Sequence, residues 1–391
     1  MFDIIGAIMK NALLVQQFIK DHIAWETLLS DKPYCIAISR EKWNGLNLLM
    51  LKYNQVESDF NNPLVRECRG LILNEDTLEP VSVPFFKFGN VSEGTWVDDI
   101  NWNDHPYVLE KCDGSLVKVV KIGGKLLVST NGTILASTAP LGDWIGCTMK
   151  SFEELFFWAL DQQFNGYGYD DLFNALEEGY TYMFELCTNY NKVVVPHPEP
   201  KVYFIGVRNN TTLAETYIMD HPLSKVFPTP KVYEFKTFQD CIEHAKSLPW
   251  NEEGYVITSK DFKRNKAKSV LYLSAHHLKN NGSLSYSRAL ELVRANEIDE
   301  VTAYFPEYKD ALEECKAKFW KLVEDTKNAW ESYKKIDASL PTRKDKALWI
   351  TKNFSFPGIA FGMLDGKITS IEDFFMNAPT EKLLRSLGYK E

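Results

Sequence analysis

The sequence lacks the features that mark several large classes of protein. None of its seven cysteines forms a Cys-x-x-Cys pair, so the spacing of a structural zinc site is missing. No apolar run approaches the ~20 residues that a membrane-spanning helix needs, and no internal repeat or low-complexity tract occurs. The first five residues, MFDII, hold an acid where a secretory signal carries basic residues. We therefore expect a cytoplasmic protein with free thiols and no membrane partner.

An excess of basic residues is also absent. The chain has 44 Lys and Arg against 53 Asp and Glu, a formal net charge of −9. This balance excludes a uniformly basic coat for nucleic acid, but it is compatible with a local basic groove, because a ligand responds to the field of a cleft. Aromatic residues are plentiful at 13% and can fill cores or stack against bases. The length of 391 residues allows two to three domains of roughly 150 residues each.

The periodicity of apolar residues changes along the chain. Residues 8–30 have helical spacing, which predicts one helix. From about 34 to 275 short β-rich runs alternate with turn signals, and adjacent glycines at 123 and 124 predict a hairpin turn. The runs lie at 34–39, 46–53, 70–73, 107–111, 116–122, 126–130, 180–186, 202–207, 255–258 and 269–273, with a helical insert at 151–177. Because turns join most of these runs, we expect antiparallel sheets in an α+β domain.

The C-terminal part has helical spacing throughout. Pro306, Pro341 and Ser370 stand where helices would begin, and apolar residues between 312 and 336 form a long amphipathic stripe. Charges nearly balance there, with 17 basic and 18 acidic residues from 281 to 391. The expected fold class is α+β, with an antiparallel-sheet domain at 1–280 followed by an all-helical domain at 281–391.

The sharpest chemical signal is the segment EKCDGS at residues 110–115. Lys111 ends one β-run there, and an Asp-Gly turn leads into the next. Such a turn would hold the Lys111 amine at the mouth of a cleft between sheets, where a neutral amine can form a phosphoramidate with a nucleotide. Taken alone, Lys-x-Asp-Gly fits a plain hairpin turn with a solvated lysine equally well.

Further charged residues stand in β-rich segments in a fixed order. Arg69 precedes an apolar strand, where its guanidinium can bind a phosphate through two nitrogens. Glu185 and Glu253 each stand among β-forming residues. Lys266 and Lys268 share one face of a strand by the period of two. Two like charges side by side destabilise a sheet unless an anion lies between them. Each residue taken singly fits a surface charge, whereas the shared order is far more specific.

That order is found in the covalent nucleotidyltransferases, which include ATP-dependent ligases and mRNA capping enzymes. The sequence most resembles the RNA ligase 1 family of T-even phages. The matching segments come in the family's order and at similar spacing from about 50 to 275: ECRG at 67–70, FKF at 86–88, KCDGSLV at 111–117, FE at 184–185, EGYV at 253–256 and KAKS at 266–269. Beyond 275 the resemblance rests on helical character alone.

The resemblance implies a role for each motif residue. Lys111 would be the catalytic nucleophile that carries AMP, Glu185 would hold the ribose, and Glu253 would orient the water shell of Mg²⁺. Asp299 falls near an acidic pair that the family associates with a second metal. ATP and Mg²⁺ are therefore the expected cofactors. The residues implied to contact ATP are Tyr53, Arg69, Lys87, Lys111, Glu185, Lys266 and Lys268.

One segment departs from the family's pattern. The family has a basic residue in a Ser-Lys-Gly-like turn after the second strand past the nucleophile. Here the segment is Ser129-Thr130-Asn131-Gly132, which contains no cation. Asn131 can donate a hydrogen bond, but the binding of phosphate or RNA at that point is expected to differ.

The resemblance implies an ATP-dependent RNA ligase that joins 5′-phosphate and 3′-hydroxyl RNA ends through lysyl-AMP and adenylated RNA. The family suggests a role in RNA repair with nicked tRNA as substrate, a helical domain for RNA specificity, and the host cytoplasm as the place of action of a phage enzyme. A separate end-healing kinase and phosphatase would be partners.

Two alternatives to this function stay open. One is a capping guanylyltransferase or DNA ligase, which would normally need an OB domain after Lys268. The other is an RNA-binding protein with a decayed nucleotidyltransferase domain.

Overall fold

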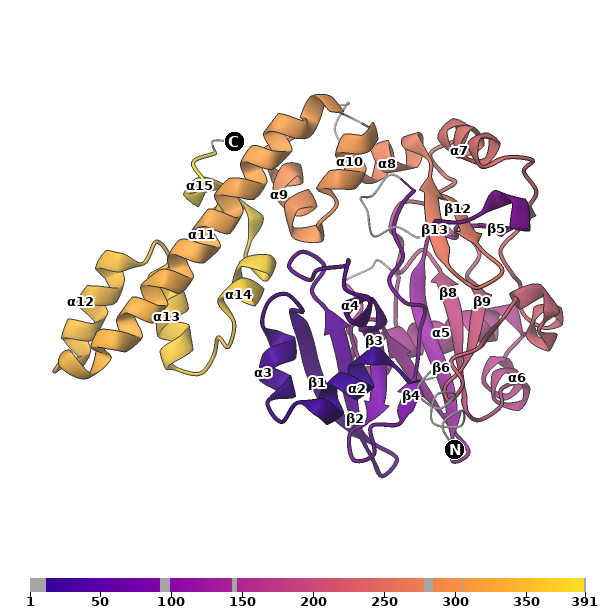
Figure 1. The fold of residues 1–391 in the computed structure, drawn as a ribbon, viewed down its shortest axis with the longest axis horizontal. Coiled ribbons are helices and arrows are strands. Elements are labelled where there is room, and N and C mark those ends of the chain that lie inside the picture. Colours follow the sequence, from indigo (N-terminus) through magenta and orange to yellow (C-terminus); the bar gives the residue numbers. More distant parts are fainter. Residues whose placement is uncertain (1–11, 92–98, 143–145, 278–283, 305, 390–391) are drawn as a thin grey trace. The chain divides into compact units, whose positions relative to one another are not determined.

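The computed structural model describes residues 12–91, 99–142, 146–277, 284–304 and 306–389 (Figure 1). The chain divides into two compact units, Met1–His276 and His277–Glu391. The predicted domain boundary at 280/281 lies outside the described residues.

The strands of the first unit form three sheets. The first has the order β1-β2-β3-β4, with β1 (Ile36–Trp43), β2 (Leu46–Tyr53), β3 (Arg69–Asn74) and β4 (Pro80–Ser82). The second has the order β10-β9-β8-β6-β7, with β6 (Ser115–Ile122), β7 (Lys125–Thr130), β8 (Tyr180–Cys187), β9 (Lys201–Asn209) and β10 (Glu215–Thr216). The third has the order β11-β5-β12-β13, with β5 (Tyr107–Glu110), β11 (Val232–Tyr233), β12 (Gly254–Thr258) and β13 (Arg264–Lys268). Neighbouring strands pair antiparallel in all three sheets, which confirms the α+β prediction.

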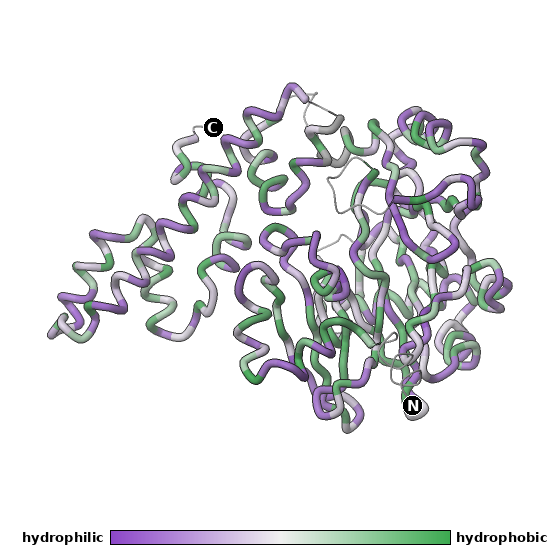
Figure 2. The backbone as a smooth tube through the Cα atoms, viewed as in Figure 1, coloured by the Kyte–Doolittle hydropathy of each residue, from purple (hydrophilic) through white to green (hydrophobic). Residues whose placement is uncertain are grey.

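Each sheet shares an apolar core with helices, and a further cluster joins Leu48 and Ile72 of the first sheet to Leu127 of the second. The helices of this unit are α2 (Leu14–Asp21), α3 (Trp25–Ser30), α4 (Pro63–Glu67), α5 (Phe152–Gln163), α6 (Gly168–Ala175), α7 (Phe238–Ser247) and α8 (Val270–His277), with short 3₁₀ turns η1 (Trp102–Asp104), η2 (Ala136–Thr138), η3 (Ile218–Asp220) and η4 (Pro222–Lys225). Residues of α2, α3 and α4 share a core with the first sheet, those of α5 and α6 with the second, and those of α7 with the third. In Figure 2 hydrophobic stretches follow these strands, while many connecting turns are hydrophilic.

Two predicted elements were wrong. The helix predicted over 8–30 is two helices where it is described, α2 and α3, because His22 is extended at φ −127° and ψ 114° and Ile23 is fully exposed. The strand predicted at 269–273 is the start of α8. Ser269 accepts the Tyr272 N–H on its hydroxyl at 3.1 Å and the Leu273 N–H on its carbonyl at 3.0 Å, so a helix cap outweighs the β-rich composition.

The described part of the second unit contains helices and no strand, which confirms the all-helical prediction for this part. Its helices are α9 (Tyr286–Ala295), α10 (Ile298–Tyr304), α11 (Lys309–Ile336), α12 (Arg343–Asn353), α13 (Pro357–Leu364), α14 (Ile371–Asn377) and α15 (Thr380–Ser386), with 3₁₀ turns η5 (Pro306–Tyr308) and η6 (Asp337–Ser339). The apolar stripe of α11 supplies Leu312, Phe319 and Val323 to a core shared with α9 and α14. As predicted, Ser370 caps α14, since its hydroxyl accepts the Asp373 N–H at 3.1 Å.

Two expectations from the sequence concern the cysteines and membrane-spanning helices. All seven cysteines are free thiols, as the sequence predicted. Among the described residues, no helix combines the length and the apolar character that crossing a membrane requires.

Candidate active site

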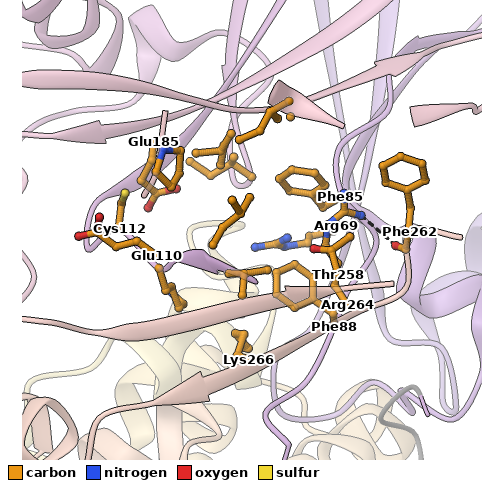
Figure 3. A pocket seen from close by; sticks show the side chains of 18 of the residues that line it. Arg69, Phe85, Phe88, Glu110, Cys112, Glu185, Thr258, Phe262, Arg264 and Lys266 are labelled. Carbon is orange, nitrogen blue, oxygen red and sulfur yellow. Dashed lines mark hydrogen bonds between the residues drawn. The ribbon is translucent and has the colours of Figure 1, made fainter. Parts of the chain in front are cut away.

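A pocket of about 340 Å³ lies among the three sheets of the first unit. It is lined by residues of β2 and β3 from the first sheet, β6, β8 and β9 from the second, and β5, β12 and β13 from the third. Figure 3 shows Glu110, Cys112 and Glu185 gathered toward one end and Arg69, Phe85 and Arg264 toward the other. The residues that the sequence assigned to ATP all line this pocket: Tyr53, Arg69, Lys87, Lys111, Glu185, Lys266 and Lys268.

Lys111 stands where β5 ends beside β12. Its backbone N–H donates to the carbonyl of Gly254 at 2.8 Å, which fixes the chain at this point. Its amine lies 2.7 Å from Oε1 of Glu253, and the amine of Lys268 lies 3.6 Å from the same oxygen. The Glu253 side chain is 5% exposed, so one buried carboxylate faces two ammonium groups. Glu253 is therefore in direct contact with the predicted nucleophile.

The Asp-Gly pair after Lys111 is an anchored turn, and Asp113 is not solvated. Asp113 is buried; its Oδ2 accepts the N–H groups of Val194 and Val195 at 2.9 and 2.6 Å, and its Oδ1 accepts the Tyr272 hydroxyl at 3.0 Å. A Cβ on Gly114 would lie 2.4 Å from the carbonyl oxygen of Leu186, so only glycine fits there. The alternative of a plain solvated hairpin turn is therefore wrong, and the turn holds Lys111 rigidly.

A second glycine helps to place Glu253 beside the lysines of the pocket. Gly254 has φ +137° and pairs in register with Lys268 at the start of β12 and the end of β13. A Cβ at this position would stand 2.0 Å from the carbonyl oxygen of Ala267. The close approach of the two strands thus places Glu253 beside Lys268.

Glu185 lies on β8 and is half-buried next to these charges. Burial raises the pKa of its carboxyl to about 7; the Lys111 amine and the Arg69 guanidinium lower it, whereas Glu253 raises it. The group therefore exchanges a proton near neutral pH. It can act as a carboxylate toward a cation or as a hydrogen-bond donor toward a ligand oxygen.

Basic groups face the pocket from two further elements. Lys266 and Lys268 both line it from β13, as their spacing predicted. The Lys266 amine and the Arg69 guanidinium lie 5.7 and 5.3 Å from the centre of the Phe88 ring. Nη1 of Arg69 is buried and has no hydrogen-bond partner among the described residues. A buried guanidinium donor left open in this way favours an anionic ligand.

Lys87 and Tyr53 complete the predicted lining. The Lys87 N–H donates to the carbonyl of Arg66 at 2.8 Å, and the Lys87 amine lies 4.7 Å from the centre of the Phe60 ring. The Tyr53 ring packs edge-on against Phe60 at 5.0 Å. Both residues therefore contact the Phe60 ring where they line the pocket.

Sequence reasoning missed a buried ion network at the other end of the pocket. Glu215 accepts from Arg264 at 2.5 Å and also from Arg208, and Arg264 lines the pocket. Burial raises the pKa of Glu215, but the two guanidinium groups outweigh it and hold the pKa below its usual range. Only the three-dimensional fold brings these scattered residues together, so no local motif could have found them.

Lys118 on β6 was also missed. Its side chain is fully buried, and its amine donates a short hydrogen bond to the carbonyl of Gly70, next to Arg69. Burial, with a smaller effect of the Arg69 charge, lowers the pKa of Lys118 to about 7. The alternation of residues along a strand indicates which side of the sheet each side chain faces. It does not show that both sides of the sheet are covered at β6, so the burial of Lys118 could not be predicted.

Asp299, assigned to a second metal, does not line this pocket. It lies on α10 of the second unit and is exposed. In the part of the chain that the structure describes, no group of three or more His, Cys, Asp or Glu side chains could hold a metal ion. Its role stays a prediction.

Known proteins resemble this chain over the same region. A family model described as RNA ligase matches residues 67–284, more than half of the chain. The putative bifunctional polynucleotide kinase/RNA ligase of Autographa californica nuclear polyhedrosis virus is 33% identical over 279 residues, which cover 68% of this chain and 38% of that protein. The putative RNA ligase of Thermovibrio ammonificans is 26% identical over 252 residues, or 60% of this chain and 59% of that protein.

A solved archaeal ATP-dependent RNA ligase shares 13% identity at a TM-score of 0.45, over 77% of this chain and 78% of that one. The chain spans less than two thirds of the length of either curated relative. The family match includes the Lys111 turn, Glu185, Glu253 and β13. On the strength of that match, this chain belongs to the RNA ligase family.

Proposed function

We propose that the protein is an ATP-dependent RNA ligase that joins 5′-phosphate and 3′-hydroxyl RNA ends, with Lys111 as the nucleophile. The observation that carries the proposal is the contact at 2.7 Å between Glu253 and Lys111, which itself lines a pocket with further basic residues from several elements. Family membership supports the same activity.

The first step would transfer AMP to Lys111. The Nζ lone pair attacks the α-phosphorus of ATP, an N–P bond forms, and the bond to the pyrophosphate oxygen breaks. The ammonium group must first lose a proton, and Oε1 of Glu253 is placed to accept it. Glu253 would also hold the amine in line for attack, since it fixes Nζ at hydrogen-bond distance.

Positive charge around the pocket would neutralise the triphosphate. Arg69, Lys266 and Lys268 line the pocket and would stabilise the charge that builds up on the phosphate oxygens. Lys87 would contact the same group of oxygens from the opposite wall. Glu185, with its readily exchanged proton, suits the ribose hydroxyls, because it can accept or donate a hydrogen bond.

A divalent cation, Mg²⁺ by preference, fits the donors that are present. Mg²⁺ is usually held by one or two carboxylates together with substrate phosphates and waters. The carboxylates of the buried Glu253 and the half-buried Glu185 lie near the predicted nucleophile, and Glu253 would hold the ion through a water molecule. A bound ion would neutralise charge on the reacting phosphate. Asp299 stays a candidate for a second ion.

The remaining steps would use RNA. The 5′-phosphate of RNA would take AMP from Lys111, which breaks the N–P bond and restores the amine. The 3′-hydroxyl would then attack the adenylated phosphate and release AMP. We propose a repair role with nicked tRNA as one substrate, with specificity supplied by the helical unit. End-healing would fall to a kinase and a phosphatase; the name of the baculovirus relative includes a polynucleotide kinase.

Sealing of RNA tests the proposal directly. A single-stranded RNA with a labelled 5′-phosphate and a free 3′-hydroxyl is incubated with the protein, ATP and Mg²⁺. The expected product resists phosphatase because the label has moved into a phosphodiester bond. A nicked DNA duplex and a 5′-diphosphate RNA with GTP serve as the alternative substrates. Product with either of these and none with RNA and ATP would favour a DNA ligase or a capping enzyme. No product with any substrate would favour a protein that only binds RNA.

A further inference from the structure

A turn at the pocket wall carries no cation of its own. Asn131 lines the pocket at the end of β7, in the segment Ser129-Thr130-Asn131-Gly132. The Thr130 hydroxyl accepts the N–H groups of Gly132 and Thr133, each at 3.1 Å, so the turn has a fixed shape. The Asn131 side-chain oxygen is buried without a hydrogen-bond partner in the described ranges. The turn thus has a fixed hydrogen-bonded shape, and the Asn131 amide, which can donate from its NH2 group to an anion, is not fully satisfied by described residues.

The side-chain amine of Lys52, a residue of another sheet, lies beside this turn. It lies on β2, and its Nζ is 3.5 Å from the position that a Cβ on Gly132 would occupy. The absence of a side chain on Gly132 leaves the amine room beside the turn. Lys52 is exposed, and among the described residues it has no ion-pair or hydrogen-bond partner.

Lys52 also stands opposite a second cation. It pairs in register with Arg69 on β3, at the point where the register of the two strands shifts. Like charges on paired residues destabilise a sheet unless an anion lies between them. Nη1 of Arg69 is itself a buried donor without a partner in the part described. Arg69 and Asn131 thus line the pocket, and Lys52, which pairs with Arg69, reaches the turn next to Asn131 without an acidic partner among the described residues.

We propose that Lys52, with Arg69 and Asn131, forms a phosphate subsite that holds the RNA strand at the edge of the nucleotide pocket. This inference rests on the proposed function. Lys52 supplies from β2 the positive charge that the turn at Asn131 lacks. The ligand group is a phosphate diester or monoester, which is the anion that RNA offers along its whole length.

The exposure of Lys52 favours RNA phosphate over the phosphates of ATP. The basic side chains that line the nucleotide pocket are all at least partly buried, whereas Lys52 is exposed and is not among the lining residues. An exposed amine at the rim meets the part of the substrate that extends out of the pocket. Loss of Lys52 should therefore impair the RNA-dependent steps more than the formation of lysyl-AMP.

The experiment measures each step for wild type and Lys52→Ala. Lysyl-AMP formation is followed with labelled ATP, and sealing is followed in single turnover with a chemically pre-adenylated RNA and no ATP. We expect sealing to fall at least tenfold more than lysyl-AMP formation. RNA binding, measured from low to moderate salt, should lose about 0.7 from the slope of log affinity against log salt, the amount for one contact to a single strand. Lys52→Arg should retain the wild-type slope.

A relocated charge provides the decisive control. Asn131→Lys in the Lys52→Ala background should restore sealing, because it puts a cation in the turn itself. Lys42→Ala removes an exposed lysine at the far end of the neighbouring strand β1 and should behave as wild type. Equal losses in both steps would place Lys52 with the ATP phosphates, and an unchanged salt slope would remove the subsite. Either result would overturn the inference. A wild-type protein that seals no RNA would instead refute the proposed function.

Discussion

At the scale of single residues, the pocket depends on charges held close together. Glu253 is shared by Lys111 and Lys268, so the predicted nucleophile and a predicted phosphate ligand meet on one oxygen. If Lys268 binds the triphosphate as predicted, it would gain an anionic partner with more charge, and Glu253 would be left with Lys111. This exchange of partners would couple nucleotide binding to the position of the attacking amine.

Removal of Lys268 tests that coupling. We expect Lys268→Ala to slow lysyl-AMP formation by the 10²–10³-fold typical of one lost transition-state contact. The matched control is Lys246→Ala, which removes an exposed lysine on α7. Rates come from single-turnover labelling with α-labelled ATP. A loss of less than tenfold, or an equal loss in the control, would separate Lys268 from the phosphates.

Lys118 gives the stability of the protein a dependence on pH. Its pKa is lowered to about 7 in the folded chain, against an ordinary value of 10.5. Between these values the unfolded chain binds more protons than the folded one, so the free energy of unfolding rises with pH in this window. Below about pH 7 the full penalty of burying the amine applies. The contribution of this group to the slope is at most about 1.4 kcal/mol per pH unit.

The variant Lys118→Met should lose this slope. The loss of the hydrogen bond to Gly70 would lower stability at every pH, but it would not alter the slope. Urea unfolding at several values between pH 7.5 and 9.5 measures the free energy of unfolding for both proteins. A wild-type slope no steeper than that of Lys118→Met would mean that Lys118 is buried with its charge.

At the scale of elements, two strand ends set the geometry of the site. A Cβ on Gly254 would clash with the backbone of Ala267 and Lys268, so no side chain can be added there without moving β12 or β13. The anchored Asp113 joins the turn after β5 to α8 through Tyr272. The catalytic arrangement thus depends on the contacts of β5, β12, β13 and α8 with one another.

A Gly254→Ala variant should therefore lose both activity and stability. The backbone clash and the positive φ together should lower the free energy of unfolding by about 1–3 kcal/mol and reduce lysyl-AMP formation strongly. Gly45→Ala is the control, because Gly45 has φ +82° in the β1–β2 turn but no atom within 4 Å of its added Cβ. Chemical denaturation and labelling are measured for both. If the two variants lost lysyl-AMP formation equally, the close approach of β12 and β13 would not matter for the site.

Strands and motif residues were the part of the structure that the sequence predicted well. Alternating apolar residues and the glycine pair at 123 and 124 located β6 and β7, since local chemistry decides such elements. The start of α8 was missed because one capping serine, Ser269, outweighed a β-rich composition. The Arg208–Glu215–Arg264 network and the approach of Lys52 to Gly132 join different strands or sheets, and no local pattern contains such contacts.

At the scale of the whole molecule, each unit has a core of its own. The sheets of the first unit pack with their helices, and the described helices of the second unit enclose a separate cluster around Phe319 and Phe375. All residues of the nucleotide pocket belong to the first unit. The second unit is nearly neutral in charge, which suits a packed bundle better than a general surface for RNA phosphates.

Truncation near Ser283 tests whether the first unit alone forms lysyl-AMP and the helical unit supplies RNA specificity. We expect the shortened chain to form lysyl-AMP and to lose its preference for a nicked stem-loop over a linear RNA. Sealing of both substrates is compared for the full and shortened chains, and Asp299→Ala in the full chain checks for a metal ligand beyond the cut. Equal selectivity of the two chains would remove the specificity role from the helical unit.

The central claim is that Lys111 carries AMP, and one measurement tests it most directly. The protein is incubated with α-labelled ATP and Mg²⁺, denatured, and separated by electrophoresis, with α-labelled GTP in parallel. The account predicts label retained with ATP alone, mapped to Lys111, and lost in Lys111→Ala while that variant still seals pre-adenylated RNA. Label that persists in Lys111→Ala, or that appears with GTP instead of ATP, would contradict it.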